Sequence, residues 1–413
     1  MDAARGVALL AMMAIHVLPA WNGDLEPTLS WSLFAGRGVA LFALLAGLSL
    51  ALSSGGPRRL DGPALSAARA GIAVRAVIIM AIGLLLGYLD IEAQVILAYY
   101  GVMFLLALPL LRLSARALTW TAGAVALLMP VVMQGVRDYL PVPGEQPTFT
   151  GLFTHFGESA GQLLFTGVYP ALPWMAYICA GLAIGRLDLR SRRVQTGLLA
   201  AGCGLALLTT LASAFLLGPG GGRQSLAELN GGSTAGAEVV DDILVWGPDP
   251  ALPTDSWWWL AGLAPYSSTP LAILNTIGIS TAVLAALLLL ERQARLVLAP
   301  LAAMGSMTLT LYTAHLLLLA TGLLNDVPMI SLLLQIVLVT VFALIWHRLK
   351  GQGPLERLVS GAVNRTRAAV LARQSGGGGT THRGLHRNRA RRNPEHGQHR
   401  AGNQDPDPPR PER

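Results

Sequence analysis

Residues 71–111 read GIAVRAVIIMAIGLLLGYLDIEAQVILAYYGVMFLLALPLL. The stretch contains two apolar runs, 71–89 and 93–111, which are joined by a short acidic segment. Each run has the length of about 20 residues that a helix needs to cross the hydrocarbon core of a bilayer. Arg69 precedes the first run and Arg112 follows the second. The stretch therefore predicts two membrane-spanning helices with an acidic loop between them and basic connections at their other ends.

Apolar runs of this kind recur along the chain. Hydrophobic residues make up 53% of the sequence and charged residues only 13%, whereas a soluble domain has about 25% charged residues. The deficit has a physical cause, because a charge in hydrocarbon costs several kcal/mol. We predict an all-α fold, a polytopic transmembrane helical bundle of about ten spans. The expected spans are 5–21, 32–52, 71–89, 93–111, 117–136, 167–185, 196–218, 270–290, 298–322 and 329–347.

The charges of the connections alternate from one connection to the next. One set is basic and contains Arg58, Arg59 and Arg69; Arg112 and Arg116; Arg186, Arg190, Arg192 and Arg193; Arg292 and Arg295; and Arg348 and Lys350. The alternate set is acidic apart from Arg137 and Arg223. Because basic loops stay on the cytoplasmic side, we expect both termini inside and a multi-pass protein of the cytoplasmic membrane. This distribution also accounts for the net charge of +7, so we expect no specific nucleic-acid partner.

The two ends of the chain differ from the bundle. The first span has no signal-peptide cleavage site and is expected to be retained, with a few residues upstream of Met1. We expect a transmembrane domain at 1–357, a cytoplasmic juxtamembrane segment at 358–374 and a basic tail at 375–413. The tail has too few apolar residues to fold, so we expect it to be disordered beside anionic lipid. We interpret its histidines as part of a solvated tail and expect no metal site; they are His382, His386, His396 and His399.

Two connections on the outer side are long, 137–166 and 219–269. The second opens with a flexible glycine-rich run and closes with the tryptophans 257–259. We interpret these tryptophans as an interfacial belt, with a contact to substrate as the alternative. The two cysteines, Cys179 and Cys203, lie inside apolar runs. They are expected to be small buried residues with no disulfide or zinc role.

Polar residues inside spans are expensive and mark candidate functional sites. On the predicted orientation, a set of such residues falls in one layer near the outer surface: His16, Arg37, Tyr169, Trp174, Asn275 and His315, with Tyr312 one turn from His315. If their faces converge, they form a polar cavity open to the outside. A histidine there can act as a general base or become acylated. Arg37 can stabilise a carbonyl or phosphate oxygen, or it can extend its charge to the outer headgroups.

The inner end of the first span contains Asp2 and Arg5. Their i,i+3 spacing puts them on the same side of the first turn. One interpretation is a helix start stabilised by an acidic residue and an ion pair. The other is binding of an anionic cofactor from the cytoplasm.

Four stretches resemble the membrane acyltransferase family of heparan-α-glucosaminide N-acetyltransferase and the bacterial YeiB-like proteins. They occur in the family's order over most of residues 1–357: DAARGVALLAMMAIH at 2–16, GRGVALFALLAG at 36–47, GVYPALPW at 167–174 continuing to GLAIGR at 181–186, and GSMTLTLYTAH at 305–315. The resemblance implies a helical bundle that takes acetyl-CoA, or another acyl-CoA, from the inside. It further implies transfer of the acyl group to an acceptor reached from the outside.

The resemblance has one gap at the catalytic position. In the lysosomal enzyme the catalytic histidine follows the first span, whereas residues 17–31 contain no histidine in this sequence. His16 and His315 are therefore both candidates for the catalyst, chosen by chemistry and depth. Arg37, Tyr169, Trp174, Asn275 and Tyr312 are candidates for binding substrate or the oxyanion, and Asp2 and Arg5 for binding the acyl-CoA.

Three functions stay open at this point. The first is an acyltransferase acting on an extracytoplasmic acceptor, which the resemblance suggests is a sugar or glycolipid. The second is a transporter or lipid translocator that uses the same polar layer as a binding site. The third is a structural or assembly protein of the membrane. Membrane lipid is a partner in all three, and a homodimer is left open.

Overall fold

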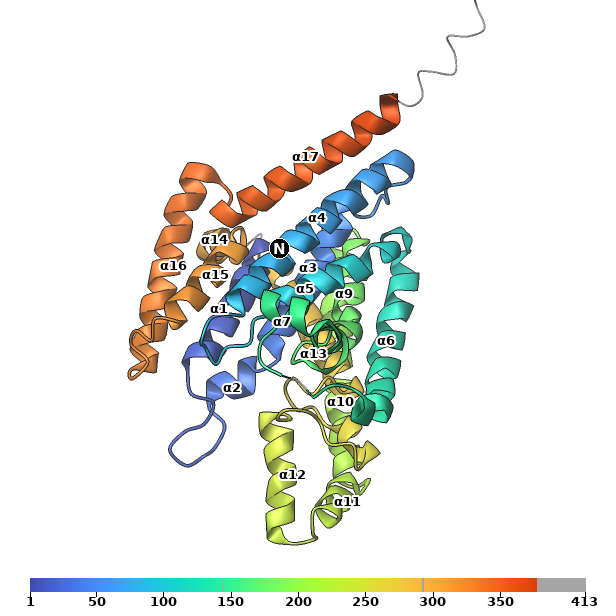
Figure 1. Ribbon diagram of the computed structural model, residues 1–413, viewed down its shortest axis with the longest axis vertical. Helices are drawn as coiled ribbons and strands as arrows, with labels where there is room; N and C mark the ends of the chain where they lie inside the picture. The colour runs from blue at the N-terminus through green and yellow to red at the C-terminus, as the bar shows by residue number, and fades with distance from the viewer. Residues whose placement is uncertain (143, 292, 377–413) are drawn as a thin grey trace, which may run out of the picture. The chain divides into compact units, whose positions relative to one another are not determined.

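The computed structural model describes residues 1–142, 144–291 and 293–376. Every regular element among these residues is helical, so the predicted all-α class is confirmed. Residues Met1–Leu371 form one unit (Figure 1), and α17 (Pro354–Gly376) extends past its end. The predicted juxtamembrane segment 358–374 is part of α17. From residue 377 onward, the predicted tail and its histidines lie outside the described residues.

Six helical stretches in the described residues are long and apolar enough to cross a membrane. They contain α3 (Arg37–Ser53, preceded by α2, Leu29–Phe34), α4 (Gly62–Leu86), α6 (Ala115–Val136), α10 (Arg192–Leu217), α13 (Pro270–Leu290) and α16 (Pro328–Lys350). Two bent helix pairs raise the number to eight if each is one span. The two remaining predicted spans coincide with shorter helices, α1 (Asp2–Val17) and α5 (Leu97–Ala107). The chain is a multi-pass membrane protein, and the count of ten and the orientation stay predictions.

The uninterrupted span predicted for 298–322 is wrong. The chain breaks between α14 (Arg295–Gly305) and α15 (Thr308–Leu319), which meet at a bend of 69°. A break frees backbone amides that need new partners. Glu356 of α17 supplies one, because its carboxylate accepts hydrogen bonds from the backbone N–H groups of Leu309 and Thr310 at 2.6 and 3.2 Å. The helix break is thus satisfied by a residue from the C-terminal helix.

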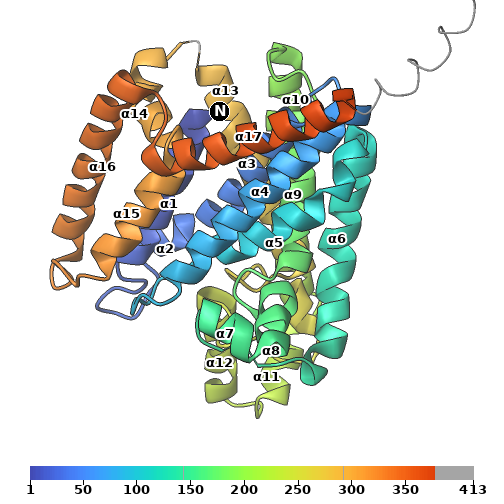
Figure 2. The ribbon, with the colours of Figure 1, turned by 45° about the horizontal axis from the view of Figure 1, so that its top comes forward.

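The second bent pair lies on the other side of the bundle centre. It joins α8 (Phe156–Gly161) and the π-helical turn η3 (Gln162–Thr166) to α9 (Ala171–Gly185), with a bend of 48°. Almost every residue of α9 is buried. Figures 1 and 2 show α9 and α3 inside the bundle and α6 and α16 at its periphery. The peripheral helices keep one apolar face uncovered, as lipid contact requires.

The long outer connection 219–269 is folded. It contains α11 (Gly222–Leu229), α12 (Thr234–Trp246) and the 3-10 turn η4 (Trp257–Ala261). These elements have a small core of their own, which includes Trp259. The belt interpretation is therefore wrong for Trp259, which is buried and donates its indole N–H to Asp255. Trp258 packs against the same core, whereas Trp257 is 59% exposed, and for Trp257 the belt stays a prediction.

The connection 137–166 is also helical in part, with η2 (Arg137–Tyr139) and α7 (Phe149–Thr154) before α8. Among the cysteines, Cys179 is buried as predicted. Cys203 is exposed, because it lies on the uncovered face of α10.

α17 lies at the end of the unit where the basic connections gather. Figure 2 shows it crossing α4. Arg367 of α17 approaches Gly71 of α4 and donates to the carbonyl of Ser53 at the end of α3. Helices α11 and α12 lie at the opposite end (Figure 1). The unit therefore has a basic end covered by α17 and an opposite end built by α11 and α12, named the outer end because the predicted orientation puts it outside.

Candidate functional site

Two histidines from distant parts of the sequence meet inside the bundle. His16 lies in the last turn of α1, and His315 lies near the end of α15. Their Nδ1 and Nε2 atoms are 3.1 Å apart, and the two rings are stacked with centroids 5.4 Å apart. His315 is only 2% exposed. The two candidate catalysts of the sequence thus form one hydrogen-bonded pair.

The pair continues into α16. His315 Nδ1 is 2.6 Å from Gln335 Oε1, and Gln335 Nε2 donates to Ser331 Oγ at 3.1 Å. Both α16 residues are buried, at 3% and 5% exposure. We did not predict these two residues. Both are polar residues inside the predicted span 329–347, so the rule that singled out the histidines could also have found them.

A very small cavity of about 10 Å³ adjoins His16. Its polar lining consists of His16, Tyr169, Tyr266 and Tyr312, and apolar side chains such as Met12 and Ile96 complete it. A volume of this size holds about one water-sized group. A reactant can therefore present only a small group to His16 in this conformation.

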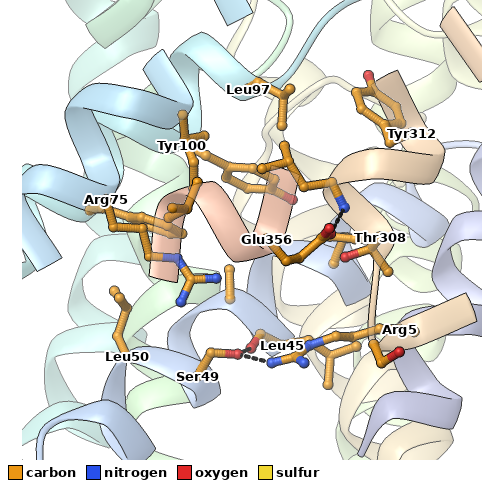
Figure 3. Close-up of a pocket in the computed structure, with 18 of the residues that line it drawn as sticks. Arg5, Leu45, Ser49, Leu50, Arg75, Leu97, Tyr100, Thr308, Tyr312 and Glu356 are labelled. Atoms are coloured by element: carbon orange, nitrogen blue, oxygen red, sulfur yellow. Dashed lines mark hydrogen bonds between the residues drawn. The ribbon is translucent and has the colours of Figure 1, made fainter. Parts of the chain in front are cut away.

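A pocket of about 350 Å³ adjoins this cavity (Figure 3), and residues of α17 at the basic end line it. Its polar lining includes Arg5, Ser49, Arg75 and Glu356, which come from α1, α3, α4 and α17. Gln352, Val359 and Ser360 add further lining next to Glu356. The C-terminal helix thus closes one side of the pocket.

The charged side chains of this inner pocket differ in whether they have ion-pair or hydrogen-bond partners. Arg5 forms the predicted i,i+3 ion pair with Asp2 at 2.9 Å and also donates to Ser49. Glu356 is engaged by the start of α15, where it also accepts from the Thr310 hydroxyl at 2.6 Å. Within the described part of the chain, no carboxylate lies in salt-bridge distance of Arg75, and its buried Nε has no hydrogen-bond partner. Figure 3 shows the guanidinium of Arg75 extending into the pocket, where it can receive an anion.

A second pocket, of about 260 Å³, lies at the outer end. Four aromatic residues lie in its wall: Trp31, Trp174, Tyr177 and Tyr266. Trp174 donates to Ser268 Oγ at 3.2 Å, and the Tyr177 hydroxyl lies 2.7 Å from Thr276 Oγ1. Burial raises the pKa of Tyr266, so its phenol stays a neutral hydrogen-bonding group. Aromatic rings with hydrogen-bonding groups of this kind suit a ligand that has both apolar faces and hydroxyl groups.

The predicted outer layer is divided between these spaces. His16, Tyr169 and Tyr312 line the small cavity, whereas Arg37, Trp174 and Asn275 line the outer pocket. Asn275 has a second task, because its amide donates to the backbone of Ala206 and to two threonines of α10. Arg37 donates to the carbonyl of Ser32 just before its own helix. Asp2 does not line the inner pocket and reaches it only through Arg5.

The three spaces form a series across the bundle. Met12, Ile96 and Tyr312 line both the inner pocket and the small cavity. Tyr266 lines both the small cavity and the outer pocket. The small cavity lined by His16 therefore lies between a pocket at the basic end and a pocket at the outer end.

Comparison with known families decides the relationship that the sequence motifs suggest. A family model described as heparan-alpha-glucosaminide N-acetyltransferase, catalytic, matches residues 1–216, which is more than half of the chain. The chain belongs to this family. No curated protein matches it.

Membership in the N-acetyltransferase family indicates a membrane acetyltransferase. The match covers His16, Arg5, Ser49 and Arg75, and also Arg37 and Trp174 of the outer pocket. It ends before His315, Gln335 and Glu356. The site is therefore assembled from the family-matched half and from helices beyond it.

Proposed function

We propose that this protein transfers a short acyl group, in the first place acetyl, from acyl-CoA in the inner pocket to an acceptor in the outer pocket. The observation that supports it best is the series of two pockets with the small cavity of His16 between them. A donor and an acceptor held on opposite sides of one histidine have the arrangement that acyl transfer across a membrane needs. On the predicted orientation the donor enters from the cytoplasm.

The inner pocket has features that suit a CoA thioester. CoA has several phosphate charges, and Arg75 and Arg5 offer guanidinium groups that bind phosphate well. The apolar partition of Met12 and Ile96 lies between these cations and His16. In this proposal the phosphates stay at the basic end while the thioester reaches past Tyr312 to the small cavity.

The outer pocket supports a sugar or glycolipid as the acceptor class. Its aromatic wall offers faces for a sugar ring, and Arg37 and Asn275 add a cation and an amide. The reacting group is a hydroxyl or an amine of that sugar. His16 takes the proton from this group as it attacks the thioester carbonyl, which is ordinary general-base catalysis.

A transporter or lipid translocator is the second candidate. The observation that favours it is the pair of bent helices, because broken helices surround the binding sites of many transporters. Such a protein would use the same spaces as a passage and would need no acyl-CoA.

The test is thermal stability of the purified protein in detergent with acetyl-CoA, longer acyl-CoAs, CoA and ATP. A ligand that binds only the folded state raises the unfolding midpoint. At a concentration of 100 times its Kd, it stabilises the folded state by about 2.7 kcal/mol. We expect acyl-CoA, but not ATP, to raise it in wild type, His16→Ala and His315→Ala. Release of CoA with D-glucosamine as the probe acceptor should be lost in His16→Ala. No midpoint shift with any acyl-CoA in folded protein would contradict the proposal and favour the transporter.

A further inference from the structure

The two histidines are hydrogen-bonded in series with a glutamine, and the order of the atoms fixes where the protons lie. Gln335 presents Oε1 to His315 Nδ1, at 2.6 Å, and its Nε2 donates to Ser331 Oγ at 3.1 Å. An amide oxygen is only an acceptor, so His315 Nδ1 must hold a proton. In a neutral imidazole the other nitrogen is then an acceptor.

The same reasoning applies to the imidazole ring of His16. His315 Nε2 is the acceptor that faces His16 Nδ1 at 3.1 Å, so His16 Nδ1 holds the proton. The remaining nitrogen of His16, Nε2, is left with a free lone pair. The opposite arrangement would set a lone pair of His315 against the Gln335 oxygen in a buried place, which is unfavourable.

We infer that Gln335 is a positioning residue: through His315 it holds His16 in the one tautomer that has Nε2 free to act as the base. The inference rests on the proposed acyl transfer and names a residue that the family match at 1–216 does not cover. Gln335 touches neither donor nor acceptor. A group that accepts a hydrogen bond from one nitrogen of a catalytic histidine decides which nitrogen is free to act as base. Gln335 has this effect on His16 through His315.

The proposed step is balanced in atoms and charge. The acceptor oxygen or nitrogen attacks the thioester carbonyl carbon, a C–O or C–N bond forms, and the C–S bond breaks. The proton of the attacking group moves to His16 Nε2 and then to the sulfur of the departing CoA. While His16 is positively charged, its Nδ1–H remains hydrogen-bonded to neutral His315, which remains bonded to Gln335.

The surroundings of Gln335 distinguish it from a residue that only fills space. Its helix, α16, has an uncovered face toward lipid, but Gln335 and Ser331 are on the buried side, one turn apart. An apolar residue of similar length would fill the same space. The amide provides an acceptor for His315, which such a residue lacks.

The test compares Gln335→Met, Gln335→Glu and the control Leu332→Ala, a buried neighbour on α16. Gln335→Met keeps length but removes the acceptor, whereas Gln335→Glu keeps an acceptor for His315. Two readouts are needed: CoA release with acetyl-CoA and D-glucosamine, and the rate at which diethyl pyrocarbonate modifies His16, followed by mass spectrometry. The reagent attacks a free imidazole lone pair and requires no acyl transfer.

We expect Gln335→Met to lower kcat by roughly 10- to 100-fold, a part of the general-base contribution of about 10²- to 10⁴-fold, with little change in KM for acetyl-CoA. Modification of His16 should slow at least several-fold. Gln335→Glu should restore most of both rates, and Leu332→Ala should affect neither rate to this extent. Ser331→Ala, which removes only the hydroxyl that holds the amide, should act in the same direction more weakly and serves if Gln335→Met does not fold.

Equal His16 modification in wild type, Gln335→Met and Ser331→Ala would overturn the inference, as would a loss in Leu332→Ala as large as in Gln335→Met. A different result separates the two proposals. If no acyl-CoA shifts the unfolding midpoint and wild type releases no CoA, while His16 modification still depends on Gln335, the acyltransferase is refuted and the positioning of His16 is upheld.

Discussion

The packing of α3 against α9 can be tested with one methyl group. Gly181 of α9 lies so close to α3 that a Cβ built on it would be 1.9 Å from the carbonyl oxygen of Leu44 and 2.7 Å from the amide nitrogen of Leu48. The contact is reciprocal, because a Cβ on Gly47 of α3 would be 2.2 Å from the carbonyl oxygen of Ile178. Small residues allow this approach of two helices in a membrane protein. The perturbation is Gly181→Ala.

The size of the effect follows from these distances. An ordinary carbon–oxygen contact is above 3 Å, so α3 and α9 would have to separate by more than about 1 Å. Overpacking of a buried contact costs about 1–3 kcal/mol, and backbone neighbours on both sides favour the upper end. Replacing a helical glycine by alanine also stabilises the helix by about 1 kcal/mol, because alanine has the higher helix propensity. We expect a net loss of about 2 kcal/mol in the free energy of unfolding.

The assay is the thermal unfolding midpoint of the detergent-purified protein, with CoA release measured on the same samples. Gly123→Ala is the matched control, since Gly123 is also inside a membrane helix, α6, and a Cβ there would meet nothing within 4 Å. The control should keep or raise the midpoint. Gly181→Ala should lower the midpoint and also activity, because α3 contributes Ser49 to the inner pocket and Arg37 to the outer one.

Equal midpoints for Gly181→Ala and Gly123→Ala would refute the reasoning. They would mean that α3 and α9 are not in backbone contact, and the positions of Ser49 and Arg37 would then lose their support. A lower midpoint with unchanged activity would refute only the second step, in which the α3–α9 spacing sets the geometry of both pockets.

Three further outcomes are expected. Arg186→Met should lower the free energy of unfolding by about 3 kcal/mol or more, since the guanidinium donates to four carbonyls and a hydroxyl at the ends of α3 and η1 (Pro109–Arg112); a midpoint equal to wild type would contradict this. Met12→Ala should raise CoA release from butyryl-CoA relative to acetyl-CoA, because Met12 separates the inner pocket from the His16 cavity, whereas Phe104→Ala, which enlarges only the inner pocket, should leave that ratio unchanged. In a cysteine-free background, an impermeant maleimide should label Gln224→Cys in intact cells and Arg58→Cys only after permeabilisation; the reverse would overturn the predicted orientation.

Much of the fold could be predicted because lipid imposes one simple rule. Each predicted span coincides with a helix or a bent pair, since an apolar run in hydrocarbon must satisfy its backbone internally. The break at Ser306 could not be predicted in the same way. Glu356, which satisfies the freed amides there, is about 50 residues away in sequence. Trp259 was misassigned for a related reason, because its partners come from α11 and α12.

The candidate site was predictable where depth alone decides position. The counting of residues from the outer surface put His16 and His315 in one layer, and the structure brings them within hydrogen-bonding distance. Depth does not give the rotation of a helix about its axis, so Asn275 turned out to hold α10 as well as to line a pocket. Arg75 was missed although it is a charged residue inside a predicted span. The cost of burying such a charge marks it as functional as clearly as it marks Arg37.

The division of the site between the two halves of the chain bears on what the family can and cannot imply. The unpaired cation of the inner pocket, Arg75, and the base, His16, both lie in the family-matched residues 1–216. Both pockets also have a wall beyond the match: Glu356 and Val359 of α17 in the inner pocket, and Leu244 and Val245 of α12 with residues 263–266 in the outer one. The match therefore covers the proposed base and the cation proposed to bind the donor phosphates. The proposed acceptor must fit Leu244, Val245 and residues 263–266, which the match does not cover, so the glucosaminide of the family's description is a class of acceptor to test and not one that membership assigns.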